Sequence, residues 1–461
     1  MRSQKISYSF PKPLVEVHSR IVSAGYQCYL VGGAVRSIVL KQDPKDWDLA
    51  TDATPEELSA LFRAVIPTGI KHGTVTILYK GMKFETTTFR IEGPYSDARH
   101  PDYVAYTDIL LEDLNRRDFT INAMAIEPDQ KILIDPFRGQ EDCNAGIVRA
   151  LGDPYLRFKE DALRILRAVR FSSQLLFTIE QETLKAMQDL SSLLSSVSAE
   201  RIREEMDKIM ASPKPSKGFL ILADTGILSI IFPELEACRG VEQKGFHAFD
   251  VFHHSILCCD FVPPTHLAVR WAALLHDIGK PLVKTLTAKG EVHFHTHEQE
   301  GAKVAQALLR RLRFPTAFEK KVVHLVLHHM FHYEENWSDA AVRRFVRRVG
   351  RENLEDLFTL READARATAG NSGNPQALSQ LRKRIARVLA QPAPLNLKDL
   401  AVNGNDLAEE VGIPRGPNMG QVLNFLLEAV LEDPSLNTRE RLLTLAKNFY
   451  QSRLSVPKHI S

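Results

Sequence analysis

The sequence contains only five cysteines among its 461 residues, and their spacing matches no metal-binding motif. Cys258 and Cys259 are adjacent, which suits neither a simple disulfide bridge nor a zinc knuckle. The odd number of cysteines predicts a protein of the reducing cytoplasm, and the first segment, MRSQKISYSF, lacks the apolar stretch of a secretion signal. No uncharged apolar run reaches the roughly 18 residues that a membrane span requires, so no membrane association is expected.

An excess of charge of one sign is also absent. The chain has 59 Lys and Arg residues against 57 Asp and Glu residues, a formal net charge of +2. Such a balance does not indicate a nucleic-acid partner for the chain as a whole, and any surface of that kind must be local. A chain of 461 residues is too long for one core, which predicts roughly two to four domains.

Strand patterns are concentrated in the first third of the chain. Residues 27–33 form a short apolar run that ends in a glycine pair, and residues 74–89 and 123–137 each predict two alternating strands joined by a turn. From about residue 155 amphipathic helical patterns dominate, as in residues 160–175. The sequence therefore predicts the α+β class: a head with a mixed sheet and helices, followed by all-helical domains.

Two carboxylates lie two positions apart in KDWDLAT, at Asp46 and Asp48. On a strand these positions share a face, so both side chains could bind one or two cations, and Trp47 between them would pack in the core. Hard oxygen ligands suit Mg²⁺, which also binds substrate phosphates. Glu85, in a hairpin that could lie beside this strand, is the candidate for a third carboxylate. The alternative is a solvated strand end, which an isolated Asp-x-Asp would favour.

Glycines and arginines accompany the carboxylates. Gly32 and Gly33 allow close backbone approach, and a helix N-terminus that follows them would suit triphosphate oxygens. Arg36 could clamp a phosphate, although a glycine pair alone favours a tight turn. Further along, the segment 116–118 (Arg-Arg-Asp) stands directly before an apolar strand. It is either an ion-pair lock or a phosphate and ribose contact.

The segment KEDALRILRAVRF places Asp161 and Arg164 three positions apart, on one face of a predicted helix. A carboxylate can accept from the exocyclic amine of cytosine or adenine, and a guanidinium can donate to the adjacent ring nitrogen. Together they would accept C and A and reject U and G. The alternative is a surface salt bridge worth about 0.3–0.5 kcal/mol.

Seven segments in order, LVGGAVR, DWDLAT, TTTFR, YSDARHPDYV, EDLNRRDFTINAMA, EDALRILRAVRF and SAERIREEMDKIM, resemble the bacterial tRNA nucleotidyltransferases, the CCA-adding enzymes of class II. They span about residues 27–210. The resemblance implies a nucleotidyltransferase head (1–147), a helical neck (148–235), an HD-type body (236–372) and a helical tail (373–461). It also implies template-independent addition of CCA to tRNA 3′ ends from CTP and ATP, with release of pyrophosphate.

The resemblance further implies roles for single residues. Asp46 and Asp48 would bind Mg²⁺, and Glu85 would complete the catalytic set. Ser37 departs from the family, which usually has an aspartate there, and this puts a supporting ion pair in doubt. The residues expected to contact the incoming nucleotide are Gly32, Gly33, Arg36, Arg116, Arg117, Asp118, Asp161, Arg164, Arg167 and Arg170.

Related activities have to be separated from CCA addition. Bacterial poly(A) polymerases share the head but typically continue RRDFTIN differently, whereas RRDFTINAMAIEP here has the CCA-adding form. Enzymes that add only CC typically have a degenerate segment after TTFR, which is intact here and offers Arg90, Asp97 and Arg99. The alternative of another class is a phosphohydrolase with a degenerate head. A catalytically inactive RNA-binding protein is disfavoured by the intact motifs.

A second set of polar residues lies in the body. The His-Asp doublet of AALLHDIGKP stands in an apolar helix, where burial without a partner is unfavourable, and it is a natural metal-binding pair. These segments resemble the HD phosphohydrolase superfamily. The resemblance implies a divalent ion (Ni, Co, Mn or Mg) that activates water, with phosphatase or 2′,3′-cyclic phosphodiesterase activity; the alternative is a domain without metal. The implied site residues are His254, His276, Asp277, His297, His329 and Asp364.

Basic residues cluster in 310–313, 320–321 and 343–348, within one helical stretch. Such a surface could neutralise tRNA phosphates, with binding that weakens steeply as salt rises. A solvated helical face is an equally good interpretation. tRNA would be recognised through its backbone and shape, because A-form grooves hide base edges from side chains.

Overall fold

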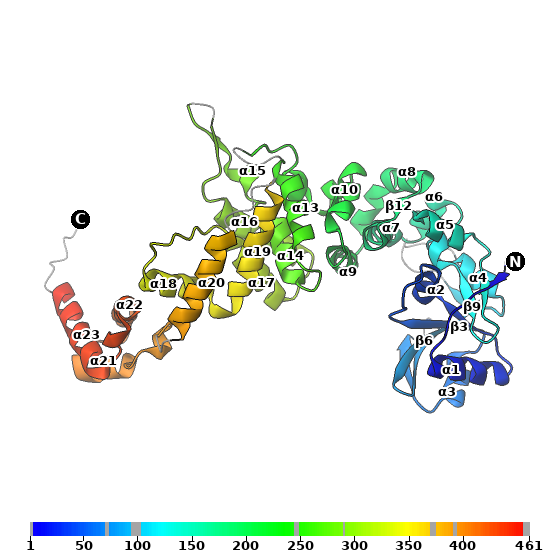
Figure 1. Ribbon diagram of the computed structural model, residues 1–461, viewed down its shortest axis with the longest axis horizontal. Coiled ribbons are helices and arrows are strands. Elements are labelled where there is room, and N and C mark those ends of the chain that lie inside the picture. Colours follow the sequence, from blue (N-terminus) through cyan, green and yellow to red (C-terminus); the bar gives the residue numbers. More distant parts are fainter. Residues whose placement is uncertain are drawn as a thin grey trace. The chain divides into compact units, whose positions relative to one another are not determined.

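The computed structural model describes residues 3–69, 73–93, 103–243, 249–288, 291–368, 375–390 and 394–454 (Figure 1). The chain forms two compact units. One comprises Met1–Ala237 with Leu308–Pro315, and the other comprises Cys238–Ala307 with Thr316–Ser461. The finer division into head, neck, body and tail stays a prediction. No helix in the described parts is long and apolar enough to cross a membrane.

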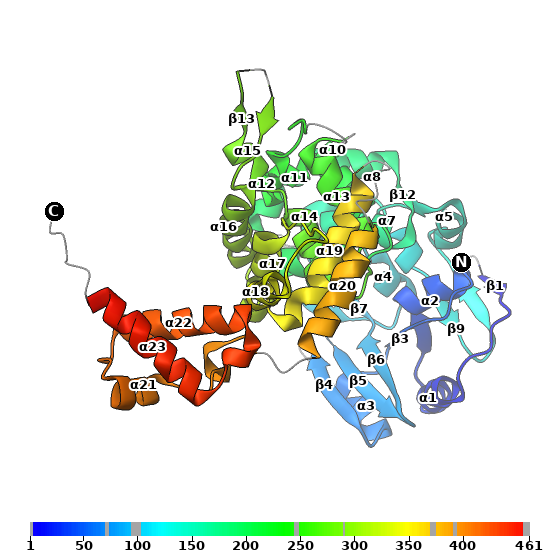
Figure 2. The same cartoon turned by 60° about the vertical axis from the view of Figure 1, so that its left-hand side comes forward.

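The first unit is built on an eight-stranded sheet in the order β1-β10-β9-β2-β3-β6-β5-β4. All neighbours pair antiparallel except β3 and β6, which run parallel, so the sheet is mixed as expected (Figure 2). The strands are β1 (Ser3–Lys5), β2 (Cys28–Val31), β3 (Trp47–Thr51), β4 (Val65–Gly69), β5 (Thr74–Tyr79), β6 (Met82–Thr88), β9 (Ala125–Glu127) and β10 (Ile132–Ile134). A separate antiparallel pair is formed by β7 (Arg90–Glu92) and β8 (Val104–Tyr106).

Both predicted hairpins are confirmed. β5 and β6 pair antiparallel around Lys80 and Gly81, which both have positive φ, and β9 pairs with β10. Helices of the head are α1 (Lys12–Ser23), α2 (Gly32–Val39), α3 (Pro55–Leu61), α4 (Leu110–Asn115) and α5 (Gly139–Ala145). The start of α3 is fixed by a capping box, in which Thr54 and Glu57 satisfy each other's backbone N–H groups. The head therefore has the α+β architecture that its sequence predicts.

Helices continue the first unit after the sheet. They are α6 (Pro154–Glu160), α7 (Leu163–Leu175), α8 (Gln181–Asp189), α9 (Ala199–Met210), α10 (Pro215–Asp224), α11 (Ile227–Ile231) and α12 (Pro233–Glu236). The helix predicted over 160–175 begins later, because Asp161 has φ −144° and ψ 105° and separates α6 from α7. Its carboxylate accepts from the backbone N–H of Leu163 at 3.1 Å, which satisfies one of the free donors of the new helix.

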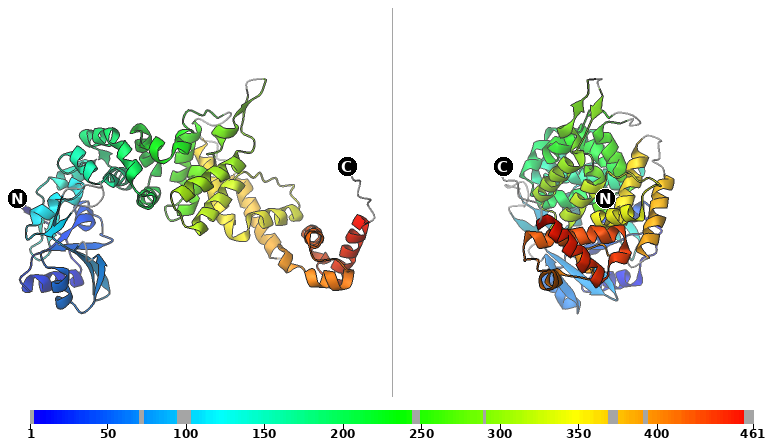
Figure 3. Two further views of the ribbon diagram at one scale, coloured as in Figure 1. Left: turned by 180° about the vertical axis from the view of Figure 1, so that it is seen from behind. Right: turned by 90° about the vertical axis from the view of Figure 1, so that its left-hand side faces the viewer.

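The second unit is helical, apart from the short pair β13 (Thr285–Leu286) and β14 (Val292–His293). Its helices are α13 (Val251–Phe261), α14 (Leu267–Leu275), α15 (Lys280–Val283), most of α16 (His297–Arg311), α17 (Thr316–His328), α18 (Asp339–Val349), α19 (Leu354–Ala367), α20 (Pro375–Leu389), α21 (Gly404–Val411), α22 (Pro417–Glu432) and α23 (Arg439–Leu454). The last turn of α16, from Leu308, belongs to the first unit. The last three helices pack around an apolar core of their own, with Leu426, Leu427 and Leu442 fully buried (orange to red in Figure 3).

Candidate active site

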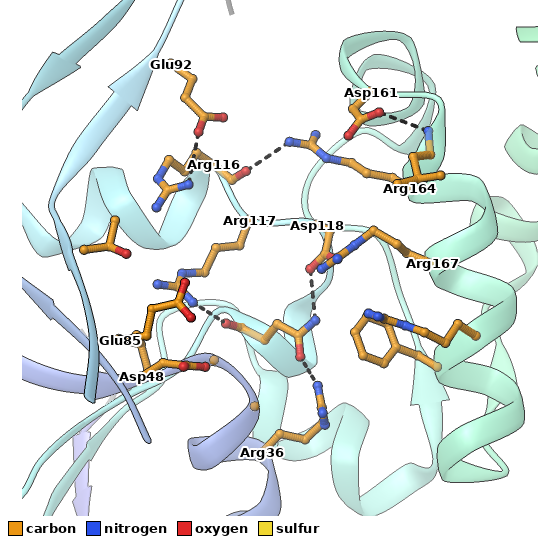
Figure 4. Close-up of a pocket in the computed structure, with 18 of the residues that line it drawn as sticks. Arg36, Asp48, Glu85, Glu92, Arg116, Arg117, Asp118, Asp161, Arg164 and Arg167 are labelled. Carbon is orange, nitrogen blue, oxygen red and sulfur yellow. Dashed lines mark hydrogen bonds and ion pairs between the residues drawn. The ribbon is translucent and has the colours of Figure 1, made fainter. Parts of the chain in front are cut away.

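One pocket of about 780 Å³ in the first unit gathers the charged residues of the head and of the helices that follow it. Figure 4 shows Asp48 and Glu85 on one side of the pocket, and Asp161 and Arg164 on the opposite side. Its lining includes all the expected nucleotide contacts: Gly32, Gly33, Arg36, Arg116, Arg117, Asp118, Asp161, Arg164, Arg167 and Arg170.

The parallel pairing of β3 with β6 brings two carboxylates together. Asp48 is the register partner of Glu85, and both side chains line the pocket. Burial, and next the charge of Glu85, raise the pKa of Asp48 to about 6. A bound cation would offset the unfavourable negative charge of these two carboxylates. Carboxylate oxygens are also the ligands that Mg²⁺ prefers.

Asp46 does not follow the predicted strand geometry. β3 begins at Trp47, so Asp46 lies in the bend before the strand, where it is exposed and outside the residues that line the pocket. It is still near enough for its charge to contribute to the raised pKa of Asp48. Trp47, the first residue of β3, is only partly buried, so the prediction that it packs in the core is wrong.

The glycine turn lies against these carboxylates. Gly32 has φ +67°, a conformation that favours glycine, and it begins α2. A Cβ at Gly32 would lie 3.4 Å from both Asp48 Oδ2 and Arg117 Nη1. The turn therefore presents bare backbone to the pocket. Arg36, one turn into α2, donates to the side-chain oxygen of Asn122 and stacks on Phe171 at 4.9 Å from the ring centre.

Arg116 and Arg117 are oriented by one buried acid that the sequence reasoning missed. Asp113 accepts from Arg116 Nη2 at 2.8 Å and from Arg117 Nη2 at 3.0 Å. The spacings i,i+3 and i,i+4 at the end of α4 could have indicated both pairs. Glu92 on β7 accepts from Arg116 Nη1 at 3.1 Å. The two guanidinium groups are thus held in place at the pocket, Arg117 beside the carboxylate edge (Figure 4).

Asp118 forms a buried ion pair with a residue 49 positions away. Arg167 Nε donates to Asp118 Oδ2 at 2.7 Å, and Asn122 Nδ2 donates to Asp118 Oδ1 at 3.0 Å. Burial alone would raise the pKa of Asp118, but Arg167 and Asn122 outweigh burial and lower it to about 2. Arg170 has a similar partner in Glu205 of α9, at 3.2 Å. Of the alternatives left open for the segment 116–118, the ion-pair lock describes Asp118.

Asp161 and Arg164 both line the pocket, but the predicted shared helix face is wrong because the helix breaks at Asp161. Asp161 Oδ2 instead accepts from Arg201 Nη2 of α9 at 2.7 Å. Arg164 pairs with Glu160 and donates to the carbonyl oxygen of Arg116 at 3.3 Å. No sequence signal linked Asp161 with Arg201. Asp97 and Arg99 lie outside the described residues, and Arg90 donates to Glu92 at 2.9 Å.

A second cluster lies in the other unit, where the expected HD residues converge. Two buried groups share Asp277: one contains His254 and His276, and the other contains His297 and His329. His254 Nε2 also lies 3.1 Å from Asp364 Oδ1, and His276 and His297 each direct Nδ1 to a backbone oxygen at 2.8 Å. These backbone contacts leave both Nε2 atoms facing the cluster. The arrangement can hold divalent cations.

The basic segments are largely engaged in ion pairs and carbonyl contacts. They lie at the end of α16 and just after it, in α17, and in α18, and therefore not in one continuous helix. Arg343 is buried and donates to the carbonyl oxygen of Leu431 at 2.7 Å, at the end of α22. Arg344 and Arg347 pair with Glu428 at 3.0 and 2.6 Å. In α18 these arginines therefore attach the helix to α22, which favours the structural interpretation over a free phosphate-binding face.

The mixed sheet, the glycine turn and the carboxylate edge define a nucleotidyltransferase of the poly(A) polymerase class. Residues 28–149 match the family model of the poly A polymerase head domain, residues 176–239 match that of the RNA and SrmB binding site of polymerase A, and residues 294–446 match that of tRNA nucleotidyltransferase domain 2. The CCA-adding enzyme of Lactobacillus johnsonii is 36% identical over 416 residues, which cover 90% of this chain and 92% of the relative. The chain belongs to the family of the CCA-adding enzymes.

Further comparisons extend over nearly the whole chain. The CCA-adding enzyme of Streptococcus agalactiae is 32% identical over 449 residues, 97% of this chain and 99% of the relative. The crystal structure of the Bacillus stearothermophilus CCA-adding enzyme in complex with CTP has a TM-score of 0.73 and 28% identity, and the match covers 96% of this chain and 98% of that chain. The Thermotoga maritima enzyme complexed with tRNA, at 20% identity and a TM-score of 0.56, shares the fold.

Proposed function

We propose that this chain adds CCA to the 3′ ends of tRNA without a nucleic-acid template, using CTP and then ATP. The observation that carries the proposal is that one pocket contains both a carboxylate edge and a pair of base-reading side chains. Relatives named CCA-adding enzymes at up to 36% identity over most of the chain favour this function over poly(A) synthesis, and over a phosphohydrolase with a degenerate head.

The carboxylate edge is suited to bind a divalent ion, with Mg²⁺ as the expected one. Asp48 and Glu85 would hold it, with Asp46 from the adjacent bend as a further ligand. When bound, the ion supplies charge neutralisation at the α-phosphate and the leaving pyrophosphate. The raised pKa of Asp48 and the proximity of Glu85 support this assignment from the protein's own chemistry.

The remaining side chains bind and orient. The bare backbone at Gly32 and Gly33 and the cationic Arg117 lie where they can contact triphosphate oxygens. Asp161 accepts a hydrogen bond from the exocyclic amine of C or A, and Arg164 donates to the neighbouring ring nitrogen. Holding the base and the phosphates at opposite sides of the pocket places the α-phosphate between them, where the tRNA 3′-hydroxyl attacks.

The test is to incubate the protein with a tRNA that ends at position 73, with each nucleotide alone and with all four. Addition that stops after CCA is expected. Long A tails would overturn the proposal in favour of poly(A) synthesis. The variant Asp48→Ala should abolish incorporation, and Glu56→Ala, which removes an exposed carboxylate of α3 outside the pocket lining, serves as the control.

We also infer that the second cluster is a divalent-metal site of HD type with phosphohydrolase activity. The observation that favours it is that buried Asp277 belongs to two groups of potential ligands. Each group also contains two buried histidines. Burial lowers the pKa of His329 to about 3, so its ring stays neutral and can act as a ligand at neutral pH. Nickel, cobalt, manganese or magnesium would be held by the imidazole nitrogens and the Asp277 and Asp364 carboxylates.

The activity is tested with 2′,3′-cyclic AMP and with p-nitrophenyl phosphate, adding each of the four metals in turn. Turnover that is lost in Asp277→Asn supports the assignment. Absence of turnover with every metal would make the cluster structural. CTP incorporation by the same variant serves as the internal control and should be unchanged. Asp277 lies in the second compact unit, whereas the pocket lies in the first.

A further inference from the structure

We propose that Arg201 is a positioning residue that fixes the carboxylate of Asp161 and thereby determines nucleotide choice. The inference rests on the proposed function of the pocket, because it concerns how Asp161 reads a base. Arg201 lies on α9, 40 positions from Asp161, and both residues line the pocket.

Both oxygens of the Asp161 carboxylate are engaged by the protein. Oδ1 accepts from the backbone N–H of Leu163 at 3.1 Å, and Oδ2 accepts from Arg201 Nη2 at 2.7 Å. The two side chains are only 18% and 22% exposed, so the contact is a charge-assisted hydrogen bond with limited access to water. Two donors fix the plane of the carboxylate, and each oxygen keeps a second lone pair for a ligand.

Arg164 is held by a different set of partners. It pairs with Glu160 and donates to the carbonyl oxygens of Arg157 at 3.2 Å and Arg116 at 3.3 Å. The two base-reading side chains therefore do not orient each other. Removal of Arg201 leaves the Asp161 carboxylate with only the Leu163 N–H as a donor, and it leaves the contacts of Arg164 unchanged.

The acceptor is the group that separates amino bases from oxo bases. Cytosine and adenine offer an exocyclic amine to a carboxylate, whereas uracil and guanine offer an oxygen at that position. A carboxylate held by one donor instead of two can turn out of its plane and loses the preferred acceptor direction, so it discriminates less against the oxo bases. The expected consequence of losing Arg201 is reduced discrimination between CTP and UTP, and between ATP and GTP.

A purely structural role for Arg201 predicts something else. α9 is already attached to α7 by the Arg170–Glu205 pair at 3.2 Å, and by buried Ile202 and Met206. If Arg201 were only an additional link of this kind, its loss would lower the rates with all nucleotides by the same factor. The ratio of kcat/KM for CTP to kcat/KM for UTP therefore distinguishes the two roles.

The experiment measures kcat and KM for CTP and UTP on a tRNA ending at position 73, with wild type, Arg201→Ala, Arg201→Lys and Arg203→Ala. Arg203 lies on the same helix, donates to the carbonyl oxygen of Arg313 and does not line the pocket, which makes it the matched control. In Arg201→Ala the CTP/UTP ratio of kcat/KM should fall about 10-fold or more, as for the loss of one hydrogen bond to a charged group. Arg201→Lys should restore part of the ratio, and Arg203→Ala should keep it.

A double-mutant cycle shows whether Arg201 acts through Asp161. In the Asp161→Ala background, Arg201→Ala should leave the ratio unchanged. An equal loss for CTP and UTP, or an unchanged ratio in Arg201→Ala, would overturn the inference. Arg201→Gln replaces Arg201→Ala if that variant is unfolded at the assay temperature. A wild-type protein that adds no CCA would contradict the proposed function itself. A wild type that prefers CTP over UTP, with the same preference in Arg201→Ala, would contradict only the role of Arg201.

Discussion

Asp48 and Glu85 are register partners on the parallel strands β3 and β6, so two carboxylates meet at one edge of the pocket. Burial and this neighbouring charge raise the pKa of Asp48 to about 6. Because the ordinary value is near 4, the charged carboxylate destabilises the folded head progressively as pH rises from about 4 to about 6, and fully above pH 6. A bound cation removes this penalty, and the consequences can be measured.

The variant Asp48→Asn should be inactive and yet more stable than wild type at neutral pH without divalent ions, by on the order of 1–3 kcal/mol. The neutral amide avoids the buried negative charge beside Glu85. Addition of Mg²⁺ should raise the Tm of wild type and leave that of the variant nearly unchanged. Thermal unfolding with Mg²⁺ or EDTA checks this; equal Mg²⁺ responses of both proteins would remove Asp48 from the metal site.

Gly32→Ala should abolish nucleotide addition. Its φ of +67° disfavours a side chain, and the added Cβ would stand 3.4 Å from Asp48 Oδ2 and Arg117 Nη1. Gly25→Ala is the matched control, because Gly25 also has a positive φ, of +95°, but a Cβ there meets nothing within 4 Å. Each substitution should destabilise by about 1 kcal/mol through backbone strain, and only Gly32→Ala should lose activity. Comparable activity of the two variants in CTP incorporation would contradict a close approach of substrate to the turn.

The Asp118–Arg167 pair should give an acid-sensitive contribution to stability. The pKa of Asp118 is lowered to about 2, so its contribution is fully present above pH 4 and is lost between about pH 4 and pH 2. At neutral pH this amounts to about 2 kcal/mol. Hydrogen exchange in α7 of wild type and Asp118→Asn checks it: protection should differ at pH 7, and the difference should shrink toward pH 2. A difference that grows on acidification would contradict the pairing.

The HD-type cluster should bind metal through two groups of ligands that share Asp277. Metal content after loading with Mn²⁺ or Ni²⁺ is expected to be highest in wild type, lower in His254→Ala and in His329→Ala, and lowest in Asp277→Asn, because only the last substitution removes a ligand from both groups. Elemental analysis of the dialysed proteins measures this order. The surface variant His332→Ala is the control, since its side chain is 82% exposed. Unchanged metal content in Asp277→Asn would exclude the shared site.

Local patterns in the sequence determined much of the head. The alternation of residues 74–89 and 123–137 reports side chains that point to opposite faces of a strand, which depends only on backbone geometry. Both hairpins therefore formed as predicted. The motifs also identified the residue types expected to contact the nucleotide, and all of these residues line one pocket.

Long-range pairing was beyond the reach of the sequence. Arg167 reaches Asp118 across 49 positions, and Arg201 reaches Asp161 across 40. An ion pair of this kind leaves no periodic trace in the chain, since it depends on the packing of whole helices. The same reason explains the basic segment 343–348, whose composition suggested RNA but in which Arg343, Arg344 and Arg347 contact α22.

The sequence by itself thus determined which chemical groups the protein possesses, and through its motifs the family to which it belongs. Only the tertiary structure decided which groups meet: Asp48 with Glu85 across a parallel strand pair, and Asp161 with Arg201 at a helix break that the amphipathic pattern had concealed. Periodicity records the direction of a side chain relative to its own element, whereas a site is defined by the distances between elements.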